Sequence, residues 1–90
     1  MTMTTSKPHL ELFYFDSCPY CQLVLRALKD LKIEVVYRDI LADSQSMNRL
    51  LKDTGRKTVP CLYIDQKPMH ESADIVAWLK KNQAQLTKAN

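Results

Sequence analysis

Apolar residues recur along the chain with two alternating periods, one typical of buried strands and one typical of amphipathic helices. Residues 10–15 form an apolar and aromatic run that predicts a buried strand. A run of β-branched side chains predicts a second strand over residues 33–38, and residues 59–64 predict a third. A turn at residues 65–67 leads into a short strand at residues 68–70, which belongs at the sheet edge because it begins with proline.

Helical spacing takes over between these strands. Apolar residues recur every three or four positions over residues 19–32, and Pro19 suits the first turn of a helix because its missing N–H would have no partner there. Asp43-Ser44 opens a second helix, which Gly55 ends. Ser72 can cap a last helix.

The order of these elements predicts an α/β fold. Helices alternating with strands at the start of the chain imply a parallel pair of strands with a right-handed crossover, and the tight turn between the last two strands adds an antiparallel pair. We therefore predict a four-stranded mixed sheet flanked by three helices, in the order β-α-β-α-β-β-α, with helices on both faces. A single domain is placed at residues 9–90, after a flexible tail at residues 1–8.

Composition and charge narrow the class of function. The 90 residues include 13 basic and 10 acidic side chains, and the net charge of +3 is scattered rather than gathered into the dense stripe that nucleic acid favours. Gly55 is the only glycine, which argues against a glycine-rich phosphate loop. No apolar run suits a signal peptide or a membrane span, and three cysteines make no paired disulfide framework. We therefore expect a cytoplasmic monomer that binds neither nucleic acid nor membranes.

Two cysteines, Cys18 and Cys21, fall where the first strand gives way to the first helix. The start of a helix offers unpaired N–H groups and the positive end of the helix dipole, which favour a thiolate over a thiol. Cys21 follows one turn later, close enough to form a disulfide with Cys18 or to resolve a mixed one. The pair therefore predicts thiol–disulfide redox chemistry, with Cys18 as the attacking residue and Cys21 as the resolving residue.

The same pair could instead form half of a zinc site or part of the core. Zinc needs two further Cys or His ligands at a matching spacing, and Cys61, His9 and His70 form no second pair. A core role does not explain why Pro19-Tyr20 separates the cysteines at a helix start. Redox chemistry is the preferred interpretation; we expect no metal, and we expect Cys61 to be a small core residue.

The segment Thr58-Val59-Pro60 stands just before the third predicted strand, which must lie near the cysteines. Cis peptide bonds are essentially restricted to X-Pro, so the segment suggests a cis bond between Val59 and Pro60. Such a bond would turn the Val59 backbone toward the cysteines, where its N–H and C=O could pair with an extended, peptide-like ligand. An ordinary proline at a strand start stays open as the alternative.

Together, Cys18-Pro19-Tyr20-Cys21 and the downstream segment at residues 55–60 (GRKTVP) resemble dithiol members of the glutaredoxin family. The resemblance extends over residues 10–79. It implies a thioredoxin-like fold with glutathione as the reductant and co-substrate. The residues that it places at a glutathione groove are Tyr20 as a lining residue, Thr58, Val59 against the tripeptide backbone and Pro60 as the cis residue.

One departure from the family pattern concerns charge. Many glutaredoxins carry Lys or Arg three residues before the first cysteine, where it attracts a glutathione carboxylate, but this chain has Phe15. Arg56 and Lys57 are then the remaining candidates for that charge.

A second departure lies before the last helix, where His70-Glu71 replaces the usual Gly-Gly. Residues 71–75 (ESADI) are instead similar to the Glu-Ser element of the glutathione transferase N-terminal domain. That similarity implies that the γ-glutamyl end of glutathione meets Glu71, Ser72 and the helix start, with Asp74 receiving its ammonium group.

The resemblance implies an oxidoreductase that reduces protein–glutathione mixed disulfides and protein disulfides, with a role in electron transport and cell redox homeostasis. Two alternatives stay open. The chain could be a thioredoxin-like protein reduced by a flavoprotein reductase, an interpretation that Phe15 favours. It could also be a noncatalytic module in which Cys18 and glutathione hold an iron–sulfur cluster between two subunits.

Overall fold

A computed structural model describes residues 8–88, and its elements follow the predicted order with one short helix added. They are β1 (Leu10–Tyr14), α1 (Pro19–Leu31), β2 (Val36–Asp39), α2 (Ser44–Thr54), β3 (Cys61–Ile64), β4 (Lys67–Met69), α3 (Ser72–Asn82) and the 3₁₀ helix η1 (Gln83–Gln85). The tail expected at residues 1–8 lies outside the described residues except for Pro8, as does the end of the expected domain at residues 89 and 90. No helix within residues 8–88 is long and apolar enough to cross a membrane.

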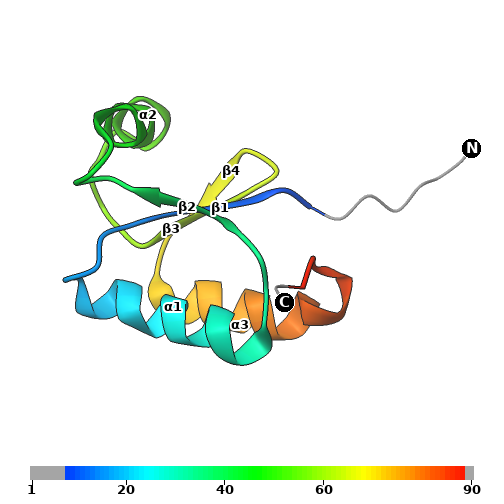
Figure 1. Ribbon diagram of the computed structural model, residues 1–90. Helices are drawn as coiled ribbons and strands as arrows, with labels where there is room; N and C mark the ends of the chain where they lie inside the picture. Colours follow the sequence, from blue (N-terminus) through cyan, green and yellow to red (C-terminus); the bar gives the residue numbers. More distant parts are fainter. Residues whose placement is uncertain (1–7, 89–90) are drawn as a thin grey trace, which may run out of the picture.

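The four strands form one mixed sheet in the order β2-β1-β3-β4. β1 pairs in parallel with β2, whereas the β1–β3 and β3–β4 pairs are antiparallel. Helices α1 and α3 lie side by side on one face of the sheet, and α2 lies on the opposite face (Figure 1). The predicted mixed sheet with helices on both faces is confirmed.

β1 is covered on both faces, so its alternating side chains serve two different cores. Leu10 and Leu12 belong to the larger core beneath α1 and α3, and Phe13 belongs to the smaller core beneath α2. The larger core comprises Leu10, Leu12, Val24, Leu28, Ile33, Val35, Leu62, Ile75, Leu79 and Leu86. The smaller core comprises Phe13, Ile40, Leu50, Cys61 and Tyr63. Cys61 is fully buried there, as predicted for a small core residue.

Several predicted boundaries were wrong at strand ends. The second strand begins at Val36 rather than Ile33, because the Ile33 N–H bonds to the end of α1 and Glu34 bonds to Thr87 near the C-terminus. The third strand begins at Cys61 rather than Val59, and the edge strand is shifted one residue earlier than predicted. Apolar or β-branched character marks burial, but the backbone partner decides where a ladder starts.

The helix ends show which polar residues act as caps. Asp43 accepts a hydrogen bond from the Gln45 N–H at 3.1 Å and opens α2, and Gly55, with φ of 78°, ends it, as predicted. Ser72 does not cap α3, contrary to the prediction. It is the first helical residue, and Glu71 occupies the cap position without making a side-chain cap bond.

Candidate active site

Cys18 is held at the start of α1 by the backbone around it. It occupies the cap position of the helix, and its sulfur accepts the Cys21 N–H at 3.4 Å, so the reactive atom itself takes the place of a polar cap. On its other side, the Cys18 sulfur lies 4.0 Å from the Val59 carbonyl oxygen. The polar residues Asp16 and Ser17 precede the helix, but Cys18 rather than either of them occupies its cap position.

The three cysteines are free thiols with different surroundings. Cys18 is 7% exposed, whereas Cys21 and Cys61 are fully buried. Burial raises the pKa of the Cys21 thiol to about 12; the Phe15 backbone opposes this effect and the adjacent Cys18 sulfur adds to it. Burial likewise raises the pKa of the Cys61 thiol to about 12. Cys21 and Cys61 therefore stay protonated at neutral pH.

Brief treatment of the folded protein with iodoacetamide at neutral pH is expected to modify Cys18 alone. Raising the pKa of Cys21 from 9.0 to about 12 lowers its thiolate fraction roughly a thousandfold, and burial removes access as well. Peptide mapping by mass spectrometry should find one adduct in the folded protein and three after denaturation. Modification of Cys21 or Cys61 at the rate of Cys18 would contradict this assignment.

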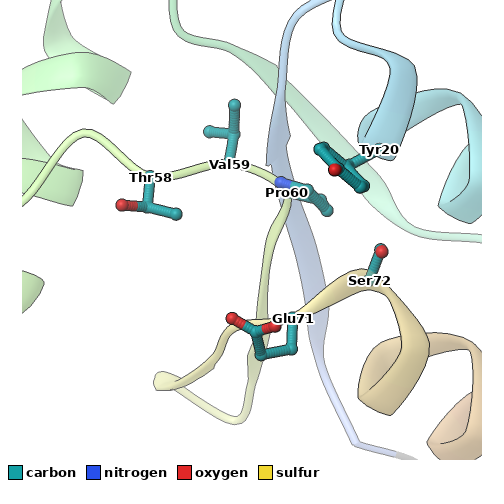
Figure 2. Close-up of a pocket in the computed structure, with 6 residues that line it drawn as sticks. All are labelled: Tyr20, Thr58, Val59, Pro60, Glu71 and Ser72. Carbon is teal, nitrogen blue, oxygen red and sulfur yellow. The ribbon is translucent and has the colours of Figure 1, made fainter.

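A cavity of about 320 Å³ is lined by Tyr20 from α1, by the segment before β3 and by the start of α3. Tyr20 stands opposite the beginning of α3, and the peptide segment leading into β3 forms a further wall (Figure 2). The Val59–Pro60 peptide bond in that wall is cis, as the sequence suggested. Because the Val59 carbonyl also lies next to the Cys18 sulfur, the cavity adjoins the cysteine pair. The lining residues are Tyr20, Thr58, Val59, Pro60, Glu71 and Ser72.

Six of the eight residues predicted to surround glutathione therefore line one cavity, although they come from three separate parts of the chain. Lys57 and Asp74 are not among the lining residues. Both are exposed: Lys57 directly precedes Thr58, and Asp74 lies two positions after Ser72. Phe15 packs against the smaller core instead of reaching solvent as a charged residue would.

Glu71 adopts a backbone conformation that is rare for a residue with a side chain. Its φ of 74° and ψ of 111° lie in a region that favours glycine, and this is one of the positions where glutaredoxins usually carry Gly. Glu71 nevertheless lines the cavity. Strain of this kind costs about 1–3 kcal/mol and is found most often at functional sites.

His70 lies one residue beyond β4, outside the edge strand, although the sequence predicted that this strand extends to residue 70. It is half-buried, and its Nδ1 is buried with no hydrogen-bond partner among residues 8–88. Burial lowers the pKa of His70, and the charge of Arg56 lowers it further against the opposing effect of Glu71. The lowered pKa favours the neutral form of the imidazole. No pattern in the sequence predicts that the Nδ1 atom of His70 is buried.

Comparisons with known proteins show the family to which this chain belongs. The sequence matches the model of a family described as the glutathione S-transferase N-terminal domain over residues 12–87. It is 34% identical over 77 residues to a glutaredoxin from Haemophilus influenzae, spanning 78% of this chain and 88% of that protein.

Solved structures support the same fold. A wheat glutaredoxin aligns with a TM-score of 0.66 at 20% identity, over 88% of this chain and 82% of that one. A glutathione transferase homologue from Drosophila mojavensis, solved with bound glutathione, gives a TM-score of 0.71 at 22% identity, but this chain spans only 36% of its length.

The similarity to the Haemophilus influenzae glutaredoxin shows that the chain is a thiol–disulfide oxidoreductase, and Cys18 and Cys21 lie at the start of the first helix of its thioredoxin-like fold. The chain belongs to the glutaredoxin family and carries the sequence pattern of the glutathione S-transferase N-terminal domain.

Proposed function

We propose that this glutaredoxin-type enzyme uses glutathione to reduce protein–glutathione mixed disulfides and protein disulfides. The observation that carries the proposal is the cavity beside Cys18, which brings together Tyr20, Thr58–Pro60 and Glu71-Ser72. We place the enzyme in the cytoplasm, because reduced glutathione is abundant there and keeps the cysteines of the enzyme reduced. We propose that it acts as a monomer.

The proposed reaction is a pair of thiol–disulfide exchanges. The Cys18 thiolate attacks the glutathione sulfur of a mixed disulfide, a new disulfide forms between Cys18 and glutathione, and the protein thiolate leaves and takes a proton from water. A second glutathione thiolate then attacks the same glutathione sulfur, which releases oxidised glutathione and regenerates the Cys18 thiolate. For a protein disulfide, the Cys18 thiolate attacks one substrate sulfur, and the other substrate sulfur leaves as a thiolate that takes the proton of Cys21. The Cys21 thiolate then attacks the Cys18 sulfur, and the second substrate thiolate leaves and takes a proton from water. Two glutathiones reduce the resulting Cys18–Cys21 disulfide and leave as oxidised glutathione.

The cavity residues have proposed roles that follow from their chemistry. The Val59 backbone pairs with the extended tripeptide, and Tyr20 with Pro60 provides an apolar wall. The γ-glutamyl carboxylate meets Ser72 and the free N–H groups at the start of α3. Glu71 and, from the rim, Asp74 face its ammonium group, whereas Lys57 approaches the other carboxylate from the exposed loop.

A coupled assay that compares two sources of electrons tests the proposal directly. The protein is supplied with a glutathionylated protein and NADPH, together with either glutathione and glutathione reductase or thioredoxin reductase alone. We expect turnover only in the glutathione-coupled assay. Turnover only with thioredoxin reductase would overturn the proposal in favour of the thioredoxin-like alternative. Visible absorbance of the freshly purified protein would instead indicate the iron–sulfur module.

Ser72→Ala is expected to raise the KM for glutathione roughly three- to tenfold, because it removes a hydroxyl that faces a carboxylate at a partly exposed site. Stability should change by less than about 0.5 kcal/mol, since Ser72 makes no cap bond in α3. Steady-state kinetics and thermal melts separate these two effects. The matched control is Ser44→Ala, at the corresponding first position of α2, and this variant should leave KM unchanged. An unaltered KM in folded Ser72→Ala would remove Ser72 from the site.

A further inference from the structure

A second groove, distinct from the glutathione cavity, runs between α1 and α3. It has a volume of about 460 Å³ and is lined by Leu23, Ser72, Ala73, Val76, Ala77 and Lys80. The two helices lie side by side on the face of the sheet that α2 does not cover (Figure 1). Most of the lining is apolar, and Leu23 is 50% exposed although it is a large hydrophobic residue. Apolar surface left open between two packed helices is suited to an apolar side chain from another molecule.

This groove adjoins the cavity beside Cys18. Ser72 lines both of them. On the facing helix, Tyr20 lines the cavity and Leu23 lines the groove, and residues three apart are neighbours on a helix surface. Tyr20 is 64% exposed, so an apolar path leads from the cysteine pair into the groove. A chain attached to a sulfur at Cys18 can therefore enter the groove without leaving the surface.

The charge of the groove indicates which residues that chain carries. Among residues 8–88, Lys80 is the only charged residue that lines the groove, and no carboxylate of that range lines it to neutralise this charge. Lys80 lies eight residues beyond Ser72, which corresponds to about 12 Å along the helix at 1.5 Å per residue. An extended polypeptide covers this distance in about four residues.

We propose that this groove docks the polypeptide of a glutathionylated substrate, with an apolar side chain about two residues from the target cysteine and an acidic residue about four residues from it. This inference rests on the proposed function and adds a substrate preference to it. Glutathione occupies the cavity, and the protein part of the mixed disulfide lies along α1 and α3. The exchange step is unchanged: Cys18 attacks the glutathione sulfur and the substrate thiolate leaves, still held by the groove.

The experiment uses glutathionylated peptides whose ends are blocked so that only side-chain charges differ. The reference peptide is Cys-Ala-Leu-Ala-Glu; one version has alanine in place of leucine and another has lysine in place of glutamate. The mixed disulfide of glutathione with 2-mercaptoethanol serves as a substrate without a polypeptide. We expect kcat/KM for the reference peptide to exceed that of the alanine version about five- to tenfold, and that of the lysine version about threefold.

Variants locate these preferences in the groove. Leu23→Ser should remove the preference for leucine, and Lys80→Glu should reverse the preference between glutamate and lysine. Lys81→Glu is the matched control, because Lys81 is the next residue of α3, is also exposed and does not line the groove. It should keep the preferences of the unmodified protein. All three variants should reduce the 2-mercaptoethanol substrate at the rate of the unmodified protein.

The outcomes distinguish this inference from the function on which it depends. Equal turnover of all peptides, together with activity on the 2-mercaptoethanol substrate, would overturn the docking groove and leave the proposed function standing. Inactivity on every substrate would overturn the proposed function, and the groove with it. A Lys80→Glu variant that behaves like Lys81→Glu would also refute the inference, since charge in the groove would then play no part. Preferences that follow the reference order and change as stated would support it.

Discussion

Replacing Cys18 with serine is expected to abolish reduction of both glutathionylated proteins and protein disulfides, with a loss on the order of a thousandfold or more. A serine hydroxyl forms no disulfide, so the first exchange has no covalent product. Cys18 is the cysteine at the helix start, with the Cys21 N–H on its sulfur and the cavity beside it, whereas Cys21 and Cys61 are fully buried. Neither of the other two thiols is placed to replace it.

Cys21→Ser should separate the two proposed activities. Reduction of a glutathionylated protein should continue, because external glutathione resolves the Cys18–glutathione disulfide. Reduction of a protein disulfide should fall sharply, because it requires a second thiol one helical turn from Cys18. Both activities can be measured in the same glutathione-coupled assay with two substrates.

Cys61→Ala is the control for loss of a buried thiol, since Cys61 lies in the core beneath α2. Cys61→Ala should retain both activities under conditions in which the variant is folded. Equal loss of deglutathionylation in Cys18→Ser and Cys21→Ser would contradict the proposed division of roles between the two cysteines.

Much of this fold could be predicted because local signals and tertiary structure agree. Pro19 at the first turn of α1, Asp43 before α2 and Gly55 after it each act where the sequence indicated. The start of α3 could not be predicted in this way. Ser72 has a good capping side chain, but Glu71, with a φ of 74°, occupies the cap position one residue earlier, and no local pattern predicts such a φ for a glutamate.

The candidate site shows the same division between local and distant information. The cysteine pair is a local motif that the sequence shows directly. Tyr20, Val59 and Ser72 were assigned to one site through resemblance to known families, and they line one cavity. By contrast, nothing in the sequence predicts the role of Glu11, which lies in an apolar strand. It is 2% exposed and forms ion pairs with Arg38 and Arg49. Its partners lie 27 and 38 residues away, so no short-range spacing could reveal them.

The Glu11 network fixes α2 against the sheet. Arg49 of α2 donates to both carboxylate oxygens of Glu11 at 2.9 Å, and Arg38 of β2 donates to one of them at 3.0 Å. The Arg49 guanidinium also lies over the ring of Tyr63, 4.8 Å from its centre, and Tyr63 donates its hydroxyl to Asp53 at 2.9 Å. Because α2 leads through Gly55 into the segment that forms a wall of the cavity, this network supports the site as well as the core.

Glu11→Gln is expected to lower the free energy of unfolding by roughly 2–4 kcal/mol at neutral pH, because it removes the charge of a buried carboxylate that pairs with both Arg38 and Arg49. For a domain of this size, that corresponds to a fall in Tm of roughly 10–25 °C. The matched control is Glu34→Gln, which changes an exposed glutamate and should alter stability by less than about 0.5 kcal/mol. Guanidinium denaturation of the two variants provides the comparison.

The pH dependence of this difference identifies its cause. Burial tends to raise the pKa of Glu11, but the hydrogen bonds and charges of Arg49 and Arg38 outweigh it and hold the pKa below its ordinary value of 4.5. The folded protein therefore binds this proton less readily than the unfolded chain does. The stability contributed by the carboxylate is fully present above pH 4.5 and is lost as the pH falls through the lower, folded-state pKa. The gap between the unmodified protein and Glu11→Gln should accordingly narrow in acid, whereas other carboxylates affect both proteins alike. A gap that stays constant from neutral pH into acid would show that packing, rather than the charge of Glu11, stabilises α2.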